Sequence, residues 1–78
     1  MEEGLVPLFP AVSVGSTNVE VVGPYYANGD LDITYRGGRL YRYSGVGVEV
    51  YKSILAAPSK GQYVTAFVAY SYAYERLS

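Results

Sequence analysis

The chain has 78 residues and a formal net charge of −1, with six Lys and Arg against seven Asp and Glu. This length accommodates one small domain, and the charge balance excludes a general electrostatic attraction to polyanions. The sequence contains neither Cys nor His, which excludes disulfides, zinc sites built on thiolate or imidazole ligands, and imidazole general-base catalysis. We therefore expect no cofactor and no metal. No apolar run approaches the roughly 20 residues that a membrane-spanning helix needs.

Residues 1–12 are predicted to form an extended apolar arm that precedes a single domain over residues 13–78. Pro7 and Pro10 interrupt the apolar stretch and favour extended backbone over helix. The acidic start, MEEG, is unlike a secretory signal, and with the absence of Cys it predicts a cytoplasmic protein.

The arm has two interpretations, because its apolar side chains need a surface to cover. They lie across the core of their own chain, or Leu5, Leu8 and Phe9 pack on a neighbouring copy and form a homodimer. We favour the first, since apolar residues usually lie inside their own fold. The homodimer is kept as a further prediction.

Three segments have the pattern of β-strands. Residues 18–23, NVEVVG, are rich in β-branched residues and are expected to end at Gly23-Pro24. Asn28-Gly29 is a strong hairpin signal. Residues 30–36 then alternate between apolar and polar side chains, and a third strand follows the turn at Gly37-Gly38. The sequence predicts a three-stranded antiparallel meander.

The stretch GGRLYRYSG places Tyr41 and Tyr43 on either side of Arg42, and the hairpin register decides which face each occupies. A two-residue loop, Gly37-Gly38, puts both tyrosines on the face opposite the apolar residues of the preceding strand. That arrangement leaves neither face coherently apolar.

A three-residue loop over residues 37–39 has the opposite effect, because a shift of one residue moves every side chain to the other face. It directs Arg42 outward, requires left-handed backbone near Arg39, and gathers one apolar face from Leu31, Ile33, Tyr35, Tyr41 and Tyr43. We favour this register, since a single-layer sheet must offer a helix layer one apolar face.

The C-terminal half changes to helical periodicity. Residues 47–57 have a wide apolar stripe and end before Pro58. Ser59 and Gln62 form the pattern of a capping box, so a second helix is expected from about Lys60. Its predicted buried face consists of Tyr63, Val64, Phe67, Val68 and Tyr70. Residues 72–77 fit an edge strand or a continued helix, and we favour the strand.

These elements predict an α+β domain in which two C-terminal helices cover one face of the three-stranded antiparallel meander. Catalysis has little support. Asp30 and Asp32 share a strand face about 7 Å apart, a separation found in paired-carboxylate sites. We favour a solvated strand face as the explanation of both residues, because nothing marks a pocket. We expect a protein that is not an enzyme.

Binding is better supported than catalysis. Arg36, Arg39 and Arg42 cluster around the third strand with tyrosines between them, as in proteins on whose rings single-stranded bases stack. The residues alone favour core packing of the tyrosines first, a protein interface second and nucleic acid third.

Several of these residues carry a family resemblance. Ser16-Thr17-Asn18, the turn at Gly23-Pro24-Tyr25, Tyr41-Arg42-Tyr43, Val50-Tyr51 with Leu55, and Ser59-Lys60-Gly61-Gln62-Tyr63 occur in the order and spacing of the KTSC domain. The chain resembles this family over roughly residues 13–77. It departs from the family pattern at Gly47, where a proline is usual, and at Val64-Thr65, where Phe-Asn is common.

The resemblance implies a function by association. The KTSC domain is named for its occurrence at the C-terminus of some lysyl-tRNA synthetases, and it also occurs as small stand-alone proteins of bacteria and their viruses. This attachment suggests RNA binding. Tyr41 and Tyr43 would stack on bases, and Arg39, Arg42 and Lys60 would contact phosphates. The alternative is a protein-binding adaptor or small inhibitor that uses a tyrosine-rich surface.

Overall fold

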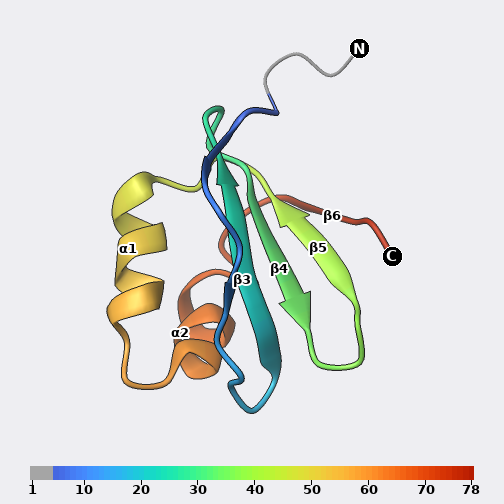
Figure 1. The fold of residues 1–78 in the computed structure, drawn as a ribbon, viewed down its shortest axis with the longest axis vertical. Helices are drawn as coiled ribbons and strands as arrows, with labels where there is room; N and C mark the ends of the chain where they lie inside the picture. Colours follow the sequence, from blue (N-terminus) through green and yellow to red (C-terminus); the bar gives the residue numbers. More distant parts are fainter. Residues whose placement is uncertain (1–4) are drawn as a thin grey trace.

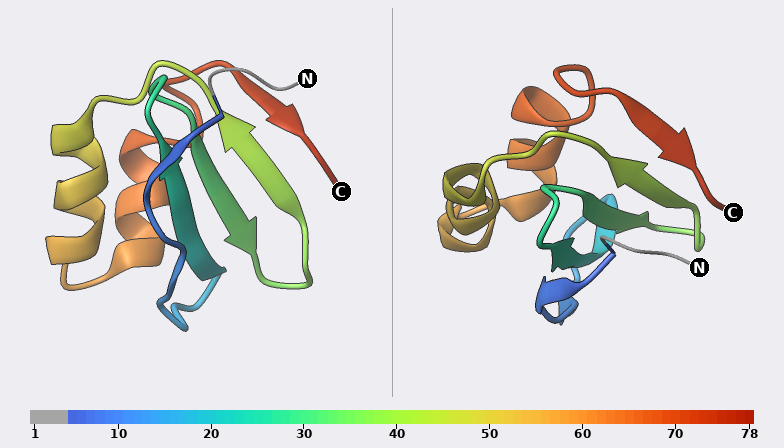
Figure 2. Two further views of the ribbon diagram at one scale, coloured as in Figure 1. Left: turned by 45° about the horizontal axis from the view of Figure 1, so that its top comes forward. Right: turned by 90° about the horizontal axis from the view of Figure 1, so that it is seen from above.

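The computed structural model describes residues 5–78, which fold into an antiparallel sheet with two helices on one side (Figures 1 and 2). The strands are β1 (Pro7–Phe9), β2 (Val12–Ser13), β3 (Val19–Tyr26), β4 (Leu31–Tyr35), β5 (Leu40–Tyr43) and β6 (Tyr74–Arg76). The helices are α1 (Val48–Ala56) and α2 (Lys60–Phe67). The α+β class is therefore confirmed.

The sheet is larger than the predicted meander. β3, β4 and β5 form the expected meander at its centre, and the full order is β1-β3-β4-β5-β6, with β2 also paired to β3. The additional strands come from the N-terminal arm and from the C-terminal tail. The preference for a strand in the tail is confirmed, because β6 pairs antiparallel with β5.

β3 does not end at Gly23-Pro24 as predicted but continues to Tyr26. The register against β4 shifts between Val22 and Tyr25, so the proline lies at an irregularity, where its missing N–H is tolerated. Gly23 has φ +103°, and a Cβ there would lie 3.1 Å from the Pro10 carbonyl oxygen. Glycine is therefore needed where the arm crosses β3.

The β4–β5 hairpin has the predicted faces but a different register. Ile33 pairs with Tyr41 and Asp32 with Arg42, and the Tyr35 N–H donates to the Arg39 carbonyl oxygen at 2.8 Å. The loop therefore consists of residues 36–38, one position earlier than the favoured loop. The reason is conformational: positive φ falls on Gly37 and Gly38, which adopt it readily, and not near Arg39.

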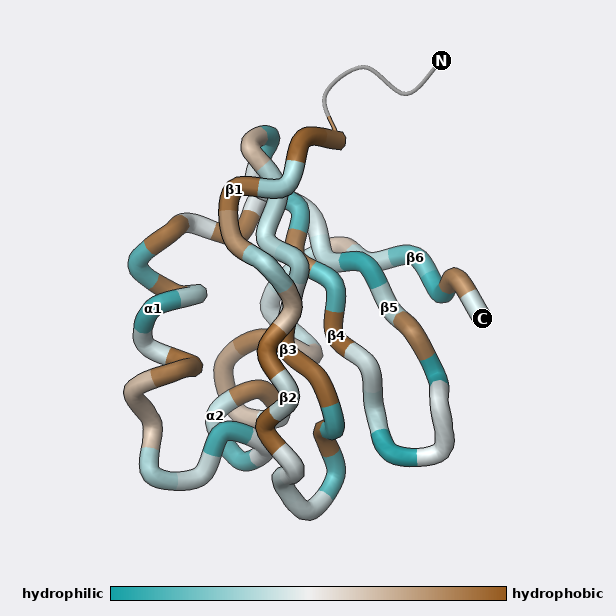
Figure 3. The backbone as a smooth tube through the Cα atoms, viewed as in Figure 1, coloured by the Kyte–Doolittle hydropathy of each residue, from teal (hydrophilic) through white to brown (hydrophobic). Residues whose placement is uncertain are grey.

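The core lies between the sheet and the helices. Its fully buried side chains include Val19, Val22, Leu31, Ile33, Ile54, Val64 and Val68. Figure 3 shows hydrophobic positions recurring on α1, β1 and the middle of β3. Within the described residues neither helix is long and apolar enough to cross a membrane.

The predicted buried face of the second helix is only partly correct. Val64 and Val68 are buried, whereas Phe67 is 58% exposed and Tyr70 is 91% exposed. α2 ends at Phe67, so the helical spacing that would place Tyr70 with Val64 and Val68 does not continue.

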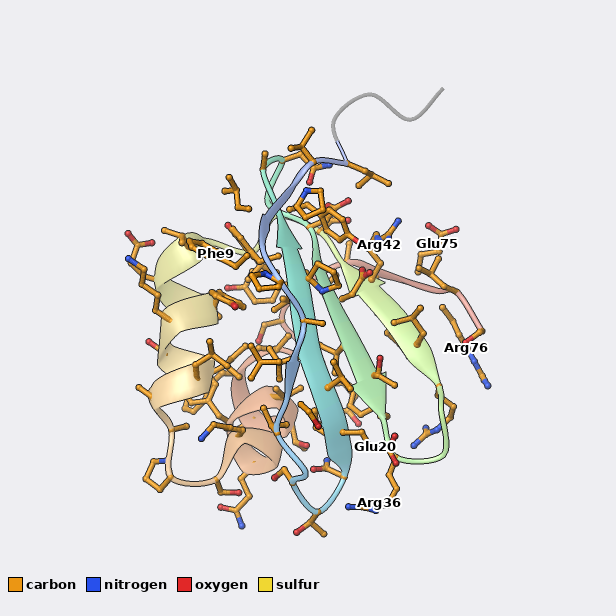
Figure 4. All side chains as sticks on the ribbon, in the orientation of Figure 1. Phe9, Glu20, Arg36, Arg42, Glu75 and Arg76 are labelled. Carbon is orange, nitrogen blue, oxygen red and sulfur yellow. The ribbon has the colours of Figure 1, made fainter. Side chains whose placement is uncertain are left out.

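The arm lies across the core of its own chain. β1 pairs with β3, and the Phe9 ring stacks on Tyr51 at 5.3 Å between ring centroids and lies 6.2 Å from Tyr25 (Figure 4). The first four residues of the predicted arm lie outside the described part of the chain. Phe9 is therefore engaged internally, which removes it from the predicted dimer contact, while Leu8 is 54% exposed.

We expect Phe9→Ala to lower the free energy of unfolding by about 2 kcal/mol, because it removes a ring that packs on the core. Leu8→Ala, one residue away, should change it by less than about 0.5 kcal/mol. Chemical denaturation of both variants measures the difference. Equal losses would contradict the packing of the arm through Phe9.

Candidate functional site: a tyrosine cleft beside helix α2

A cleft of about 350 Å³ opens on the helix side of the sheet, where β5 and β6 face the C-terminal end of α2. We call it the tyrosine cleft. It is lined by Asn18, Tyr35, Arg39, Tyr41, Tyr43, Thr65, Ala69, Tyr70 and Tyr74. None of these lining residues is acidic. Three of the five predicted site residues, Arg39, Tyr41 and Tyr43, are among them.

Tyr43 forms the base of the cleft and belongs to the core. It is 2% exposed, and its hydroxyl lies 2.5 Å from that of Tyr35. Burial, and then the contact with Tyr35, raises the pKa of Tyr43 well above its ordinary value of 10. The ring therefore stays neutral and supports its neighbours, and little of it is accessible for stacking on a ligand.

Tyr41 is half-buried and joins the base of the cleft to its rim. Its ring meets Tyr35 edge-on at 5.4 Å and lies 5.3 Å from the ring of Tyr74. Tyr74 is itself 58% exposed. Tyr70, on the opposite side, is more exposed still. The accessible aromatic surface of the cleft therefore comes from Tyr41, Tyr70 and Tyr74.

Two guanidinium groups lie over tyrosine rings that line the cleft. Arg39 is exposed and lies 5.6 Å from the ring centroid of Tyr35, and Arg76 lies 5.9 Å from that of Tyr41. Such cation–π contacts hold an arginine near a ring. Arg39 Nη2 also donates to the Arg36 carbonyl oxygen at 3.5 Å and Arg76 Nε to that of Ser78 at 2.9 Å, and the remaining N–H donors of each guanidinium are available to an anion. Sequence reasoning missed Arg76, because its position depends on the pairing of β6 with β5.

Arg42 lies on the opposite face of the sheet and does not reach the cleft. Its Nε donates to Asp32 Oδ1 at 2.7 Å and its Nη2 to Asp32 Oδ2 at 3.0 Å. The guanidinium also lies 4.9 Å from the ring centroid of Tyr26, whose hydroxyl donates to Asp32. The hydrogen bonds to Asp32 raise the pKa of Arg42. Arg42 is thus on the outer face, as predicted, but it is an internal partner of Asp32.

The two carboxylates considered for catalysis have different surroundings and different bonding partners. Asp32 is buried and bound to Arg42, whereas Asp30 lies in the β3–β4 turn, where its backbone N–H and side chain bond to Asn28. Neither carboxylate lines the tyrosine cleft.

Lys60 begins α2 and is also outside the tyrosine cleft. Its Nζ donates to the Ala57 carbonyl oxygen at 3.0 Å, which ties the α1–α2 connection. Ser59 caps α2 as predicted, since its Oγ accepts from the Gln62 N–H at 3.4 Å. Lys60 and Ser59 therefore both form hydrogen bonds within the fold.

A second cleft of about 340 Å³, which we call the polar cleft, lies along the N-terminal part of α2. Its lining residues are Thr17, Asn18, Ser59, Gly61, Gln62, Thr65 and Ala66. Sequence reasoning did not identify it as a site. The signal was present in the Ser16-Thr17-Asn18 and Ser59-Lys60-Gly61 motifs, which are 40 residues apart in the sequence but adjacent in the fold.

Hydrogen bonds hold the walls of the polar cleft. The Gly61 N–H donates to Ser16 Oγ at 2.9 Å, and Asn18 Nδ2 donates to Thr65 Oγ1 at 2.9 Å. Arg36 donates to the carbonyl oxygens of Ser16 and Thr17, at 2.9 and 2.8 Å (Figure 4). Arg36 therefore fixes the loop before β3 and is committed to it.

Glycine at position 61 is required by this approach. A Cβ would clash with Asn18 Oδ1 and lie 2.7 Å from Ser16 Oγ. We expect Gly61→Ala to destabilise the fold by about 1–3 kcal/mol through overpacking, although alanine favours a helix elsewhere. In an Asn18→Ala background the same change should cost less, since one clashing group is gone. Denaturation of the four proteins in this cycle measures the coupling; an unchanged cost would argue against the close contact.

The KTSC domain model matches residues 15–72, which is most of the chain. The fold is similar to the crystal structure of a KTSC domain protein from Yersinia pestis, with a TM-score of 0.81 and 23% sequence identity. That alignment covers 87% of this chain and 96% of the other. A search of curated proteins found no match. Because the family model matches residues 15–72, this chain belongs to the KTSC domain family.

Proposed function

We propose that this chain is a small non-enzymatic module that binds single-stranded nucleic acid, RNA foremost, through the tyrosine cleft. One observation carries the proposal: the cleft combines accessible tyrosine rings with Arg39 and has no acidic lining residue, and Arg76 lies beside its Tyr41 ring. Aromatic rings beside cations are how proteins bind unpaired bases without a specific sequence. The volume of about 350 Å³ is at the small end of the range for ligand pockets.

The proposed contacts divide between stacking and charge. A base stacks on Tyr74 and the accessible part of Tyr41, an interaction worth roughly 1–3 kcal/mol per base in single-strand binders. Arg39 and Arg76 lie beside these rings and meet the phosphates. Because the whole chain carries a net charge of −1, the attraction is local, and the salt dependence should correspond to about one or two phosphates.

The proposed site adds Tyr74 and Arg76 to the sequence prediction and leaves out two of the predicted residues. Arg42 is left out because Asp32 neutralises it on the other face of the sheet. Lys60 is left out because its ammonium group bonds within the α1–α2 connection. Tyr43 is assigned a supporting role beneath Tyr41.

A protein partner is the second candidate. It is favoured by the exposure of Phe67, Tyr70 and Tyr74, since aromatic residues are enriched at protein interfaces. A homodimer through the arm also remains a proposal, now resting on Leu5 and Leu8. Light scattering at high protein concentration measures it, and a monomeric mass would count against it.

A charge-matched pair of variants tests nucleic-acid binding. Arg39→Gln should weaken binding of a labelled single-stranded RNA and reduce the slope of log affinity against log salt by about one unit. Lys52→Gln removes the same charge from an exposed residue of α1 and should leave both quantities nearly unchanged. Fluorescence anisotropy at two salt concentrations measures them.

Wild-type protein that does not bind RNA at low salt would contradict the proposal and favour the protein partner. Equal effects of the two variants would show that any binding is not located at the tyrosine cleft.

A further inference from the structure

The tyrosine cleft and the polar cleft meet. Asn18 and Thr65 line both of them, and the Asn18 Nδ2 to Thr65 Oγ1 hydrogen bond lies at the junction. The two clefts therefore lie side by side along α2, with volumes of about 340 and 350 Å³, and we call the pair the groove.

One side of α2 runs along this groove. The lining residues Gln62, Thr65, Ala66 and Ala69 have the i, i+3, i+4, i+7 spacing of a single helical face, with Ala69 in the turn that follows the helix. Seven residues of helix correspond to about 10 Å. This exceeds the roughly 3.4 Å between neighbouring bases in one strand of a duplex, so more than one nucleotide has room along it.

The two halves differ in chemistry. The tyrosine cleft is lined by tyrosine rings and Arg39, while the polar cleft has neutral hydroxyl and amide groups from Thr17, Ser59 and Gln62. Groups of the second kind commonly contact the sugar and phosphate of a nucleic acid and not a base face. The groove therefore suits an extended ligand with unlike parts in regular succession.

We propose that the groove binds two consecutive nucleotides of a single strand. The base of one stacks in the tyrosine cleft, and the sugar and phosphate of its neighbour lie in the polar cleft against Thr17 and Gln62. This inference rests on the proposed function and specifies how the ligand lies. The polar cleft is held by the Ser16–Gly61 and Arg36–Thr17 hydrogen bonds, so binding there orders little additional backbone.

Ligand length tests the two halves separately. Uridine monophosphate, the dinucleotide UpUp and a uridine tetranucleotide serve as probes, with affinities from NMR titration. Wild-type protein should bind the dinucleotide at least about tenfold more tightly than the mononucleotide, because the second contact is intramolecular. Mononucleotide binding below detection, with a measurable dinucleotide affinity, satisfies the same expectation.

Two variants locate the effect. Thr17→Ala/Gln62→Ala changes two exposed side chains, so the fold should be retained, and it should abolish the gain from the second nucleotide without altering mononucleotide affinity. Tyr74→Ala should weaken all probes. Ser53→Ala, on the exposed side of α1, is the control and should change none.

These experiments distinguish a failure of the two-nucleotide inference from a failure of the proposed function. If the double variant keeps the wild-type length dependence while Tyr74→Ala weakens binding, the tyrosine cleft functions alone and the two-nucleotide inference is wrong. If wild-type protein binds no probe, both the inference and the proposed function are wrong.

Discussion

The pairing of β4 with β5 around Gly37-Gly38 determines which side chains the helices cover and which the cleft receives. In this register Ile33 and Tyr41 face the helices, while Asp32 and Arg42 pair directly across the strands on the other face. A slip of one residue would bury the charges under the helices and expose the rings. The two glycines permit this register because both have positive φ. The Asp32–Arg42 ion pair stabilises the same register on the outer face of the sheet.

Much of this arrangement could be predicted from local patterns. Alternation located the three central strands, and the need for one apolar face placed Tyr41 and Tyr43 correctly although the loop was misplaced by one residue. Sequence reasoning missed two further features because each depends on a partner distant in the sequence. The pairing of Arg42 with Asp32 and the position of Arg76 beside Tyr41 follow from strand pairing, which a single sequence does not display.

The tyrosines of the cleft contribute both to folding and to the candidate site, and their exposure increases from the base of the cleft to its rim. Tyr43 is buried and neutral, Tyr41 is half-buried, and Tyr74 and Tyr70 are exposed at the rim. Substitutions near the base of the cleft therefore report chiefly on stability, and those at the rim report on binding. The close contact of Gly61 with Ser16 and Asn18 has a similar double effect, since it joins α2 to the sheet and forms the wall of the polar cleft.

NMR mapping of a short single-stranded RNA on labelled protein is the most direct measurement of which face binds. We expect chemical-shift changes that saturate together at Arg39, Thr65 and Tyr74, on the helix side of the sheet. The region around Asp32 and Arg42 should change little, because the sheet separates it from the groove. Changes concentrated at Asp32 and Arg42, or none at all, would contradict the account.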